Sequence, residues 1–296
     1  MKSTAIRSIL VASDFSSEAN HAASRAALLA REHDAALRLL TVVRENLLAE
    51  LRRHLGAEAD ATQRLLDGAS LDLEALAARL PAPSQPTERL VRRGDVVTEI
   101  LAASDHSDLL VLGAHGLSPT RDALIGTTAE RLLLKGRRPM LVVRKEPRDA
   151  YQRILVAVDF SLHSIHALEF AARIAPGAQL HAVHAYDYPY ESLLRSAEIP
   201  EDSIRSLPAQ FREEALTNVR NILEKAGVTE RASSNVVVGN PRHVIHSAAA
   251  EREADLIVLG KHGHSALGEL FLGGVTRQVL SRANCDVAVI PDYPRP

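Results

Sequence analysis

The chain has 296 residues, of which 46% are hydrophobic and 24% charged, and its formal net charge is −2. This length suits two domains of about 150 residues each, and without a long basic block a nucleic-acid partner is not expected. No apolar run reaches the roughly 18 residues of a membrane span and no signal peptide is recognisable, so we expect a cytoplasmic protein without a membrane partner. The only cysteine, Cys285, precedes an apolar run and is expected to be a buried packing thiol.

The first half of the chain alternates apolar segments with amphipathic ones. An apolar segment starting at Ile9 ends before Asp14, and Ser16 is placed to cap the helix that follows. The expected strands cover residues 37–43, 88–92, 109–112 and 140–143, and the expected helices cover residues 18–32, 57–80, 96–104 and 128–134. Strands that alternate with helices at these lengths predict a parallel sheet with helices on both faces.

The second half repeats the first. Residues 9–16 (ILVASDFS) match residues 154–161 (ILVAVDFS), 145 positions later. The further strands expected here cover residues 180–185, 235–238, 256–259 and 287–290, and the helices cover residues 164–174, 208–226, 242–251 and 276–281. We therefore expect two related domains, covering residues 1–147 and 148–296, with the break in a charged stretch.

A glycine-rich segment occurs once in each half. The first runs Gly113-Ala-His-Gly116, then nine residues, then Gly126-Thr-Thr; the second, 147 positions later, runs Gly260-Lys-His-Gly263, then nine residues, then Gly273-Gly-Val. Each follows an apolar run and precedes a helix-like stretch. A glycine loop between a strand and a helix start can direct free backbone N–H groups at an anion. The sequence therefore predicts two related anion-binding sites.

The aspartate after strand one, the G-x-x-G loop and the G-[ST] pair after nine further residues together resemble the universal stress protein family. The resemblance covers essentially the whole chain as a tandem pair. It implies an α/β fold of two tandem Rossmann-like domains of the adenine nucleotide alpha hydrolase-like type, each a five-stranded parallel sheet flanked by helices. It also implies a stress-response or regulatory role with bound ATP, ADP or AMP, and Mg²⁺ is expected to enter with the nucleotide. The last strands, residues 140–143 and 287–290, are expected to lie side by side in an intramolecular pseudo-dimer, with a further homodimer left open.

The resemblance assigns the site residue by residue. Asp14 is placed against the adenine or ribose, the backbone of Val42 beside the base, and His115 near the ribose or phosphates. The glycines remove side chains where the loop approaches the nucleotide, and Thr127 adds a hydroxyl to the amide groups at the positive end of a helix. The first-half set is Asp14, Val42, Leu112, Gly113, His115, Gly116, Gly126, Thr127 and Thr128. The second-half set is Asp159, Gly260, Gly263, Gly273, Gly274 and Val275.

The two sites are not expected to be equal. Gly274 stands at the position of Thr127, so the hydroxyl is lost, and a hydrogen bond to phosphate contributes about 1.5–3 kcal/mol. This predicts binding weaker by about 10- to 100-fold in the second half, unless Thr276 compensates. The alternatives to nucleotide binding are purely structural roles, in which the glycines only permit turns and Asp14 only caps a helix.

Other functions are disfavoured by motifs that the sequence lacks. No G-x-x-x-x-G-K-[ST] segment suggests a P-loop kinase, and no G-x-G-x-x-G segment follows a strand, as a dehydrogenase needs. The pairs His163/His166 and His243/His246 have helical spacing but no further ligand nearby, so we expect surface histidines and not a metal site. Two alternatives to a nucleotide-binding regulator stay open. One is a slow ATP hydrolase using the same pocket, and the other is a structural tandem protein that binds no nucleotide.

Overall fold

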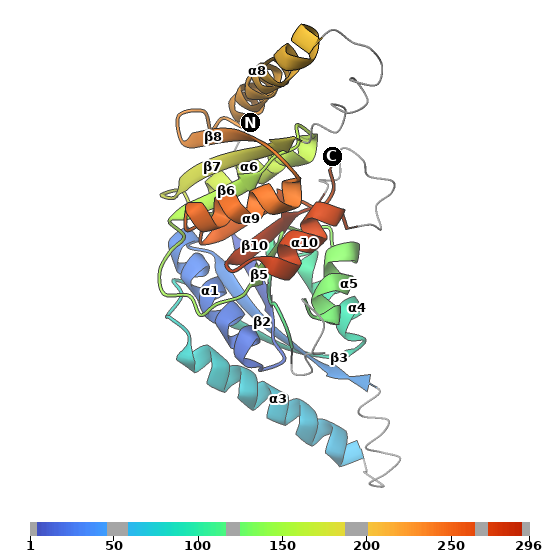
Figure 1. The fold of residues 1–296 in the computed structure, drawn as a ribbon. Coiled ribbons are helices and arrows are strands. Elements are labelled where there is room, and N and C mark those ends of the chain that lie inside the picture. Colours follow the sequence, from blue (N-terminus) through green and yellow to red (C-terminus); the bar gives the residue numbers. More distant parts are fainter. Residues whose placement is uncertain (1–4, 46–58, 117–124, 187–200, 264–271, 292–296) are drawn as a thin grey trace. The chain divides into compact units, whose positions relative to one another are not determined.

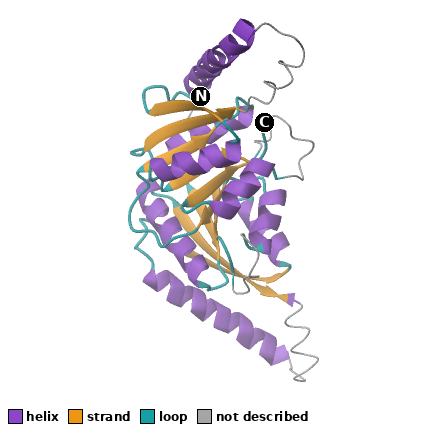
Figure 2. Ribbon diagram, viewed as in Figure 1, coloured by secondary structure: helices purple, strands orange, loops and turns teal. Residues whose placement is uncertain are grey.

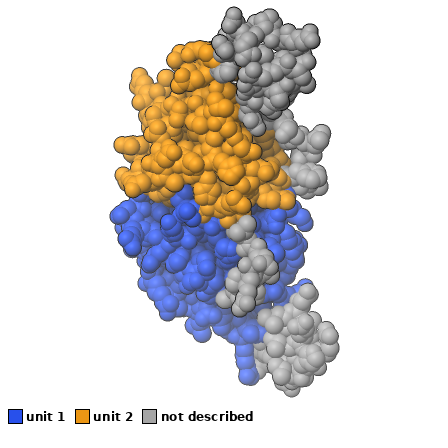
Figure 3. Space-filling view, in the orientation of Figure 1, with its two compact units in different colours: residues 1–150, 284–296 blue, residues 151–283 orange. Residues whose placement is uncertain are grey.

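The computed structural model describes residues 5–45, 59–116, 125–186, 201–263 and 272–291 (Figure 1). The chain divides into two compact units, one of Met1–Ala150 with Asn284–Pro296 and the other of Tyr151–Ala283 (Figure 3). The last segment of the chain therefore belongs to the first unit. Among the described residues, no helix is both long and apolar enough to cross a membrane.

Unit 1 is built on a mostly parallel sheet. Its strands are β1 (Ser8–Ala12), β2 (Ala36–Arg44), β3 (Glu88–Gly94), β4 (Leu109–Gly113), β5 (Met140–Val143) and β10 (Asp286–Ile290). They lie in the order β3-β2-β1-β4-β5-β10. The first five are parallel to their neighbours, whereas β10 runs antiparallel to β5, with Ala288 opposite Leu141. This is the pair of last strands that we expected to lie side by side.

The helices of unit 1 cover a sheet that is apolar on both faces. They are α1 (Ser17–His33), α3 (Ala59–Arg79), α4 (Val96–Ser104) and α5 (Thr127–Lys135). Consecutive residues Ile9, Leu10 and Val11 of β1 are all fully buried, as in a parallel strand covered from both sides. Helix α1 presents a face of alanines to β4 and β1, and these small side chains let the helix lie close to the sheet.

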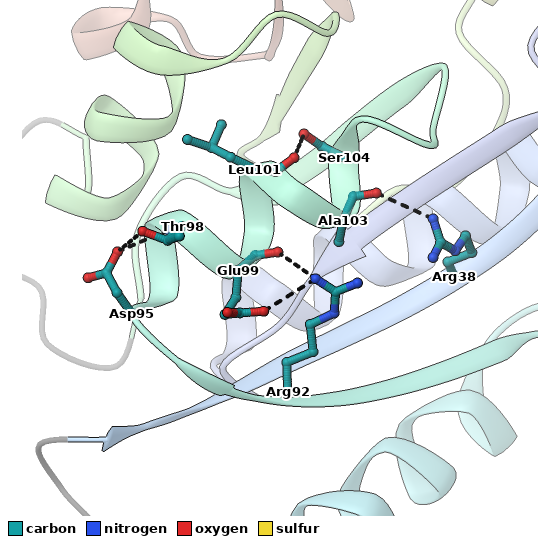
Figure 4. Close-up of polar contacts among 8 residues, drawn as sticks. All are labelled: Arg38, Arg92, Asp95, Thr98, Glu99, Leu101, Ala103 and Ser104. Carbon is teal, nitrogen blue, oxygen red and sulfur yellow. Dashed lines mark hydrogen bonds and ion pairs between the residues drawn. The ribbon is translucent and has the colours of Figure 1, made fainter.

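The turn from β3 into α4 is fixed by side-chain hydrogen bonds (Figure 4). Asp95 caps α4 by accepting hydrogen bonds from the N–H of Thr98 at 2.9 Å and from its hydroxyl at 2.8 Å. The first of these bonds is the largest cause that lowers the pKa of Asp95. Arg92 on β3 donates to both the carbonyl and the carboxylate of Glu99, so the first turns of α4 are tied to the end of the strand.

Unit 2 repeats the alternation of strands and helices (Figure 2). Its strands are β6 (Arg153–Ala157), β7 (Gln179–Tyr186), β8 (Ala232–Val238) and β9 (Leu256–Gly260), in the order β9-β6-β7-β8 and all parallel. Its helices are α6 (Leu162–Ile174), α8 (Glu201–Lys225), α9 (Pro241–Glu251) and α10 (Gly274–Arg282). The strand order matches that of β4-β1-β2-β3, so the internal repeat of the sequence is a repeat of the fold. The predicted α/β class with parallel sheets and flanking helices is confirmed.

Two details of the prediction are wrong. The helix expected from Pro208 begins earlier, at Glu201, so Pro208 lies inside the helix. A proline there removes one backbone hydrogen bond but does not have to end the helix. Cys285 is half-buried and not buried, because it precedes the first residue of β10 and lies outside the covered strand. The expected helix start at residue 57 lies outside the described residues.

His181 on β7 is a buried histidine, with 6% of the residue exposed. Its Nδ1 lies 2.8 Å from the hydroxyl of Ser233, and its Nε2 has no hydrogen-bond partner among the described residues. Burial, with a smaller contribution from the charge of Arg252, lowers the pKa of His181 from 6.5 to about 4. The folded state therefore holds this ring neutral at pH values where the unfolded chain would protonate it.

Unit 2 should consequently lose stability in mild acid. As pH falls from 6.5 to 4, the unfolded chain binds a proton that folded His181 does not, which lowers the free energy of unfolding by up to about 3 kcal/mol. Urea denaturation across this range measures the effect. His181→Gln should remove this component, and His243→Gln, at an exposed position on α9, should retain it. Identical pH profiles for the native chain and His181→Gln would contradict the assignment.

Candidate functional site

The predicted first-half residues gather at the carboxyl ends of β1 and β4. Asp14 follows β1, Gly113 ends β4, and Gly126 stands just before α5. The N–H of Gly126 donates to the carbonyl of Ala114 at 2.8 Å, which brings the two ends of the glycine loop together. The part of the loop over residues 117–124 lies outside the described residues.

Asp14 is held at the rim by a tight turn. The side chain is exposed, and its Oδ1 accepts a hydrogen bond from the N–H of Ser16 at 3.1 Å. Phe15 between them has a left-handed backbone with φ 65°, and Phe160 has the same φ in the second half. A left-handed phenylalanine is strained, and such strain is found preferentially at functional sites. The strain therefore marks both aspartates as candidates for a role beyond helix capping.

Glycine is required at different positions of the loop for different physical reasons. A Cβ at Gly116 would lie 2.5 Å from Oδ2 of Asp14, so the glycine leaves room for the carboxylate. A Cβ at Gly113 would lie 2.8 Å from the backbone carbon of Glu18, so this glycine lets β4 lie against α1. At Gly126 the nearest described atom would be 3.4 Å away, which is ordinary contact, and φ is −62°. The described neighbours therefore give no internal reason for glycine at 126.

Helix α5 presents its first turn next to this carboxylate. Gly126 is its N-cap and supplies no side-chain cap, while Thr127 and Thr128 are exposed. The first amide groups of a helix have no partner within the helix and carry its partial positive charge. Of the remaining predicted residues, Leu112 is buried in β4 and Val42 is half-buried in β2.

His115 has an acidic neighbour that the sequence did not reveal. The pKa of Glu18 is lowered, first by a hydrogen bond from the hydroxyl of Ser17 and, to a smaller extent, by the charge of His115. The corresponding pair in the second half is His163 and His262, whose rings meet edge to face at 6.3 Å. The two loops thus share their backbone and differ in the charge around them.

Asp159, the second-half aspartate, accepts hydrogen bonds from two serines. Its Oδ1 accepts hydrogen bonds from the N–H of Ser161 at 3.2 Å, from its hydroxyl at 2.5 Å, and from the hydroxyl of Ser164 at 2.7 Å. Ser164 stands where the first half has Ala19. The contact of Oδ2 with the glycine is kept, because a Cβ at Gly263 would also lie 2.5 Å from it.

Near its end, strand β7 carries the rings of His184 and Tyr186 where β2 carries Thr41 and Val43. His184, at the position of Thr41, is 9% exposed, and its Nδ1 lies 2.8 Å from the carbonyl of Val158. Its ring lies 4.0 Å from that of Phe160 and is stacked with that of Tyr186 at 6.5 Å. These rings lie at the end of β7 that corresponds to the Val42 region of β2, where the sequence led us to expect the base.

The start of α10 differs from the start of α5 by more than the lost hydroxyl. Thr276 donates its hydroxyl to the carbonyl of Gly260 at 2.9 Å, so it does not take over the role of Thr127. The guanidinium of Arg242 lies instead at this point, 3.0 Å from where a Cβ of Gly274 would be. Sequence reasoning missed Arg242; the available signal was an arginine at the position of Val97, which is buried.

The remaining second-half loop residues repeat the first-half geometry. A Cβ at Gly260 would lie 2.8 Å from Cβ of His163 on α6, so this glycine has a packing reason like that of Gly113. Gly273 precedes α10 and donates its N–H to the carbonyl of Lys261 at 3.1 Å, and Val275 is half-buried in the first turn. Residues 264–271 lie outside the described part of the chain.

Three of the four paired histidines are less exposed than predicted, whereas His243 is exposed as predicted. His163 and His166 are half-buried on α6, because this face of the helix lies against β9, and His246 lies 2.6 Å through Nε2 from the carbonyl of Arg282. Within the described ranges, no group of three or more His, Cys, Asp or Glu side chains is arranged to hold a metal ion.

Comparison with known proteins agrees with this architecture. The model of the universal stress protein family matches residues 5–144 and again residues 150–291. A universal stress protein of Methanocaldococcus jannaschii is 32% identical over 143 residues, covering 47% of this chain and 82% of the relative. Universal stress protein YxiE of Bacillus subtilis is 30% identical over 146 residues, covering 47% of this chain and 99% of the relative.

Longer relatives match both halves. Universal stress protein E of Escherichia coli K12 is 25% identical over 209 residues, which span 67% of this chain and 64% of that protein. The crystal structure of a universal stress protein from Archaeoglobus fulgidus shares the fold, with a TM-score of 0.63 at 19% identity over 96% of this chain and 98% of that one. This chain belongs to the universal stress protein family and carries two copies of the family's domain in tandem.

Proposed function

We propose that this chain is a stress-response regulator that binds an adenine nucleotide, ATP, ADP or AMP, in its first half. The observation that carries the proposal is the packing of the Asp14 carboxylate against Gly116, with the uncapped start of α5 on the same loop. A carboxylate can accept hydrogen bonds from an adenine amino group or a ribose hydroxyl, and the first amides of a helix attract phosphate. The proposed contacts are the first-half set: Asp14, Val42, Leu112, Gly113, His115, Gly116, Gly126, Thr127 and Thr128.

Glycine at 126 supports the phosphate assignment. The described protein neighbours would accept a Cβ there at ordinary contact distance, so they do not require glycine. A ligand that approaches the backbone closely would require it. Thr127 adds a hydroxyl donor next to the same amides. Mg²⁺ would enter with a triphosphate, held in part by its oxygens.

The second half is proposed to bind nucleotide more weakly. Its set is Asp159, Gly260, Gly263, Gly273, Gly274 and Val275. Asp159 accepts three hydrogen bonds through Oδ1, and the ring of His184 packs against that of Phe160 near the strand end where a base would be expected. A ligand there would have to displace these contacts before making its own. We place the domain boundary at residues 147 and 148, and the two domains form an intramolecular pseudo-dimer through their last strands.

A slow ATP hydrolase is the second candidate, favoured by one observation. The charge of His115 is among the smaller causes that lower the pKa of Glu18, so a carboxylate lies within electrostatic range of a potential general base. Phosphate release followed over hours separates the two functions. Bound ATP without turnover supports the regulator, and steady turnover abolished by His115→Asn supports the hydrolase.

Calorimetric titration with nucleotides tests the proposed site. Thr127→Ala should weaken ATP binding by about 10- to 100-fold, because a hydrogen bond to a charged phosphate is lost. Cyclic AMP keeps the base and ribose without a free phosphate tail, so its affinity should change less. Thr217→Ala, an exposed threonine on α8, is the control and should leave ATP affinity unchanged. Equal affinities of the native chain and Thr127→Ala for ATP would contradict the assignment.

A further inference from the structure

A buried ion pair lies where β10 joins the first unit. Arg25 on α1 is 7% exposed and Asp286 at the start of β10 is 3% exposed, and their Nε and Oδ2 atoms are 3.3 Å apart. The other oxygen of Asp286 accepts a hydrogen bond from the N–H of Arg144 at 2.9 Å. Arg25 also donates to the carbonyl of Asp149 at 2.6 Å. Both charged groups are thus taken out of water and held by defined partners.

The internal repeat supplies neither partner in the other half. The position of Asp286 corresponds to Pro139, and the position of Arg25 corresponds to Phe170, which is 1% exposed. The ion pair therefore forms only where α1 of the first half meets β10 of the second half.

We propose that the Arg25–Asp286 pair makes the edge of β5 selective for β10 of the same chain and rejects a second copy of β5. If two chains paired through β5, each Arg25 would meet Pro139 and remain a buried charge without a carboxylate. If two chains paired through β10, each Asp286 would meet the apolar ring of Phe170. A charge buried without its partner is strongly unfavourable, whereas an apolar replacement of both partners is tolerated. The pair thus acts against wrong pairings more than it stabilises the right one.

Such selectivity matters because a tandem chain carries two similar strands, β5 and β10, each of which could pair with the wrong partner. Apart from Asp286, the strands β5 and β10 are both short and apolar, and every residue of both strands is buried. Their side chains alone give little to distinguish one from the other, and apolar strand edges pair readily with foreign strands. The inference concerns strand choice and does not depend on nucleotide binding.

Cysteine crosslinking during refolding reads out which strands have paired. In a Cys285→Ser background, Leu141→Cys and Ala288→Cys place one thiol on each strand at opposed positions. Oxidative refolding followed by peptide mapping distinguishes the 141–288 disulfide within one chain from 141–141 and 288–288 disulfides between chains. With Arg25 and Asp286 intact, we expect the first product to dominate.

Replacing both charges tests the proposal. Arg25→Leu with Asp286→Val should raise the 141–141 and 288–288 products by at least about tenfold relative to the 141–288 product. Arg38→Leu with Glu88→Val removes the ion pair between β2 and β3 at 2.8 Å and should leave the product ratio unchanged. If the apolar double variant does not fold, Asp286→Asn replaces it and should change the ratio in the same direction. An unchanged ratio in the folded variant, or an equal change in the control, would overturn the proposal.

Discussion

Gly126→Val should abolish ATP binding by the first half, with an affinity loss of at least about 100-fold. The side chain would occupy the space beside the first amides of α5, where the phosphates are proposed to lie. The protein itself should accept the substitution, because a Cβ at this position meets no described atom closer than 3.4 Å. Calorimetry measures the loss of binding, and circular dichroism verifies that the variant is folded.

Gly273→Val is the matched control at the equivalent position of the second half. Its Cβ would meet the carbonyl of Lys261 at 3.3 Å, a contact similar to that at Gly126. Because Asp159 and His184 already engage the second-half site, this variant should leave total nucleotide binding nearly unchanged. Equal losses from the two substitutions would show that the halves bind equally and would contradict the proposed ranking.

Gly113→Ala should destabilise the protein by about 1–3 kcal/mol. A Cβ at this position would lie 2.8 Å from the carbonyl carbon of Glu18 and 2.9 Å from the N of Ala19. Both atoms belong to the backbone of α1, so the clash cannot be relieved by rotating a side chain and the helix has to move. Urea denaturation gives the change in the free energy of unfolding.

The control for this prediction is a glycine with open space around it. Gly68 lies inside α3 and a Cβ there would meet nothing within 4 Å, so Gly68→Ala should stabilise the chain by about 0.5–1 kcal/mol. The two substitutions add the same methyl group with opposite expected signs. A Gly113→Ala variant as stable as the native chain would mean that β4 and α1 are less closely packed than described.

The fold was predictable because its signals are local and occur twice. The apolar run from Leu109 and the glycine that ends it became β4, and Ser16 caps α1 as its position predicted. The grouping of the last strand with the first unit did not follow from such local signals. β10 is consecutive in sequence with α10, yet it is grouped with the unit of β5 because of its pairing with that strand.

The sequence predicted which residues form the candidate site, but only partly why each residue type is needed there. The spacing of the glycines pointed to Gly113 and Gly116 equally, but only the packing separates contact with α1 from contact with Asp14. The difference between the halves also depends on contacts across the sequence. Ser164 and His184 carry no motif of their own, and they matter only because of what they touch.

The most direct test of the central claim is to denature the purified full-length protein and identify the released small molecules by mass spectrometry. The proposed first-half site predicts an adenine nucleotide at about one molecule per chain, or its binding from added ATP at millimolar concentration or below. Protein that releases no nucleotide and takes up none at millimolar ATP would contradict the claim.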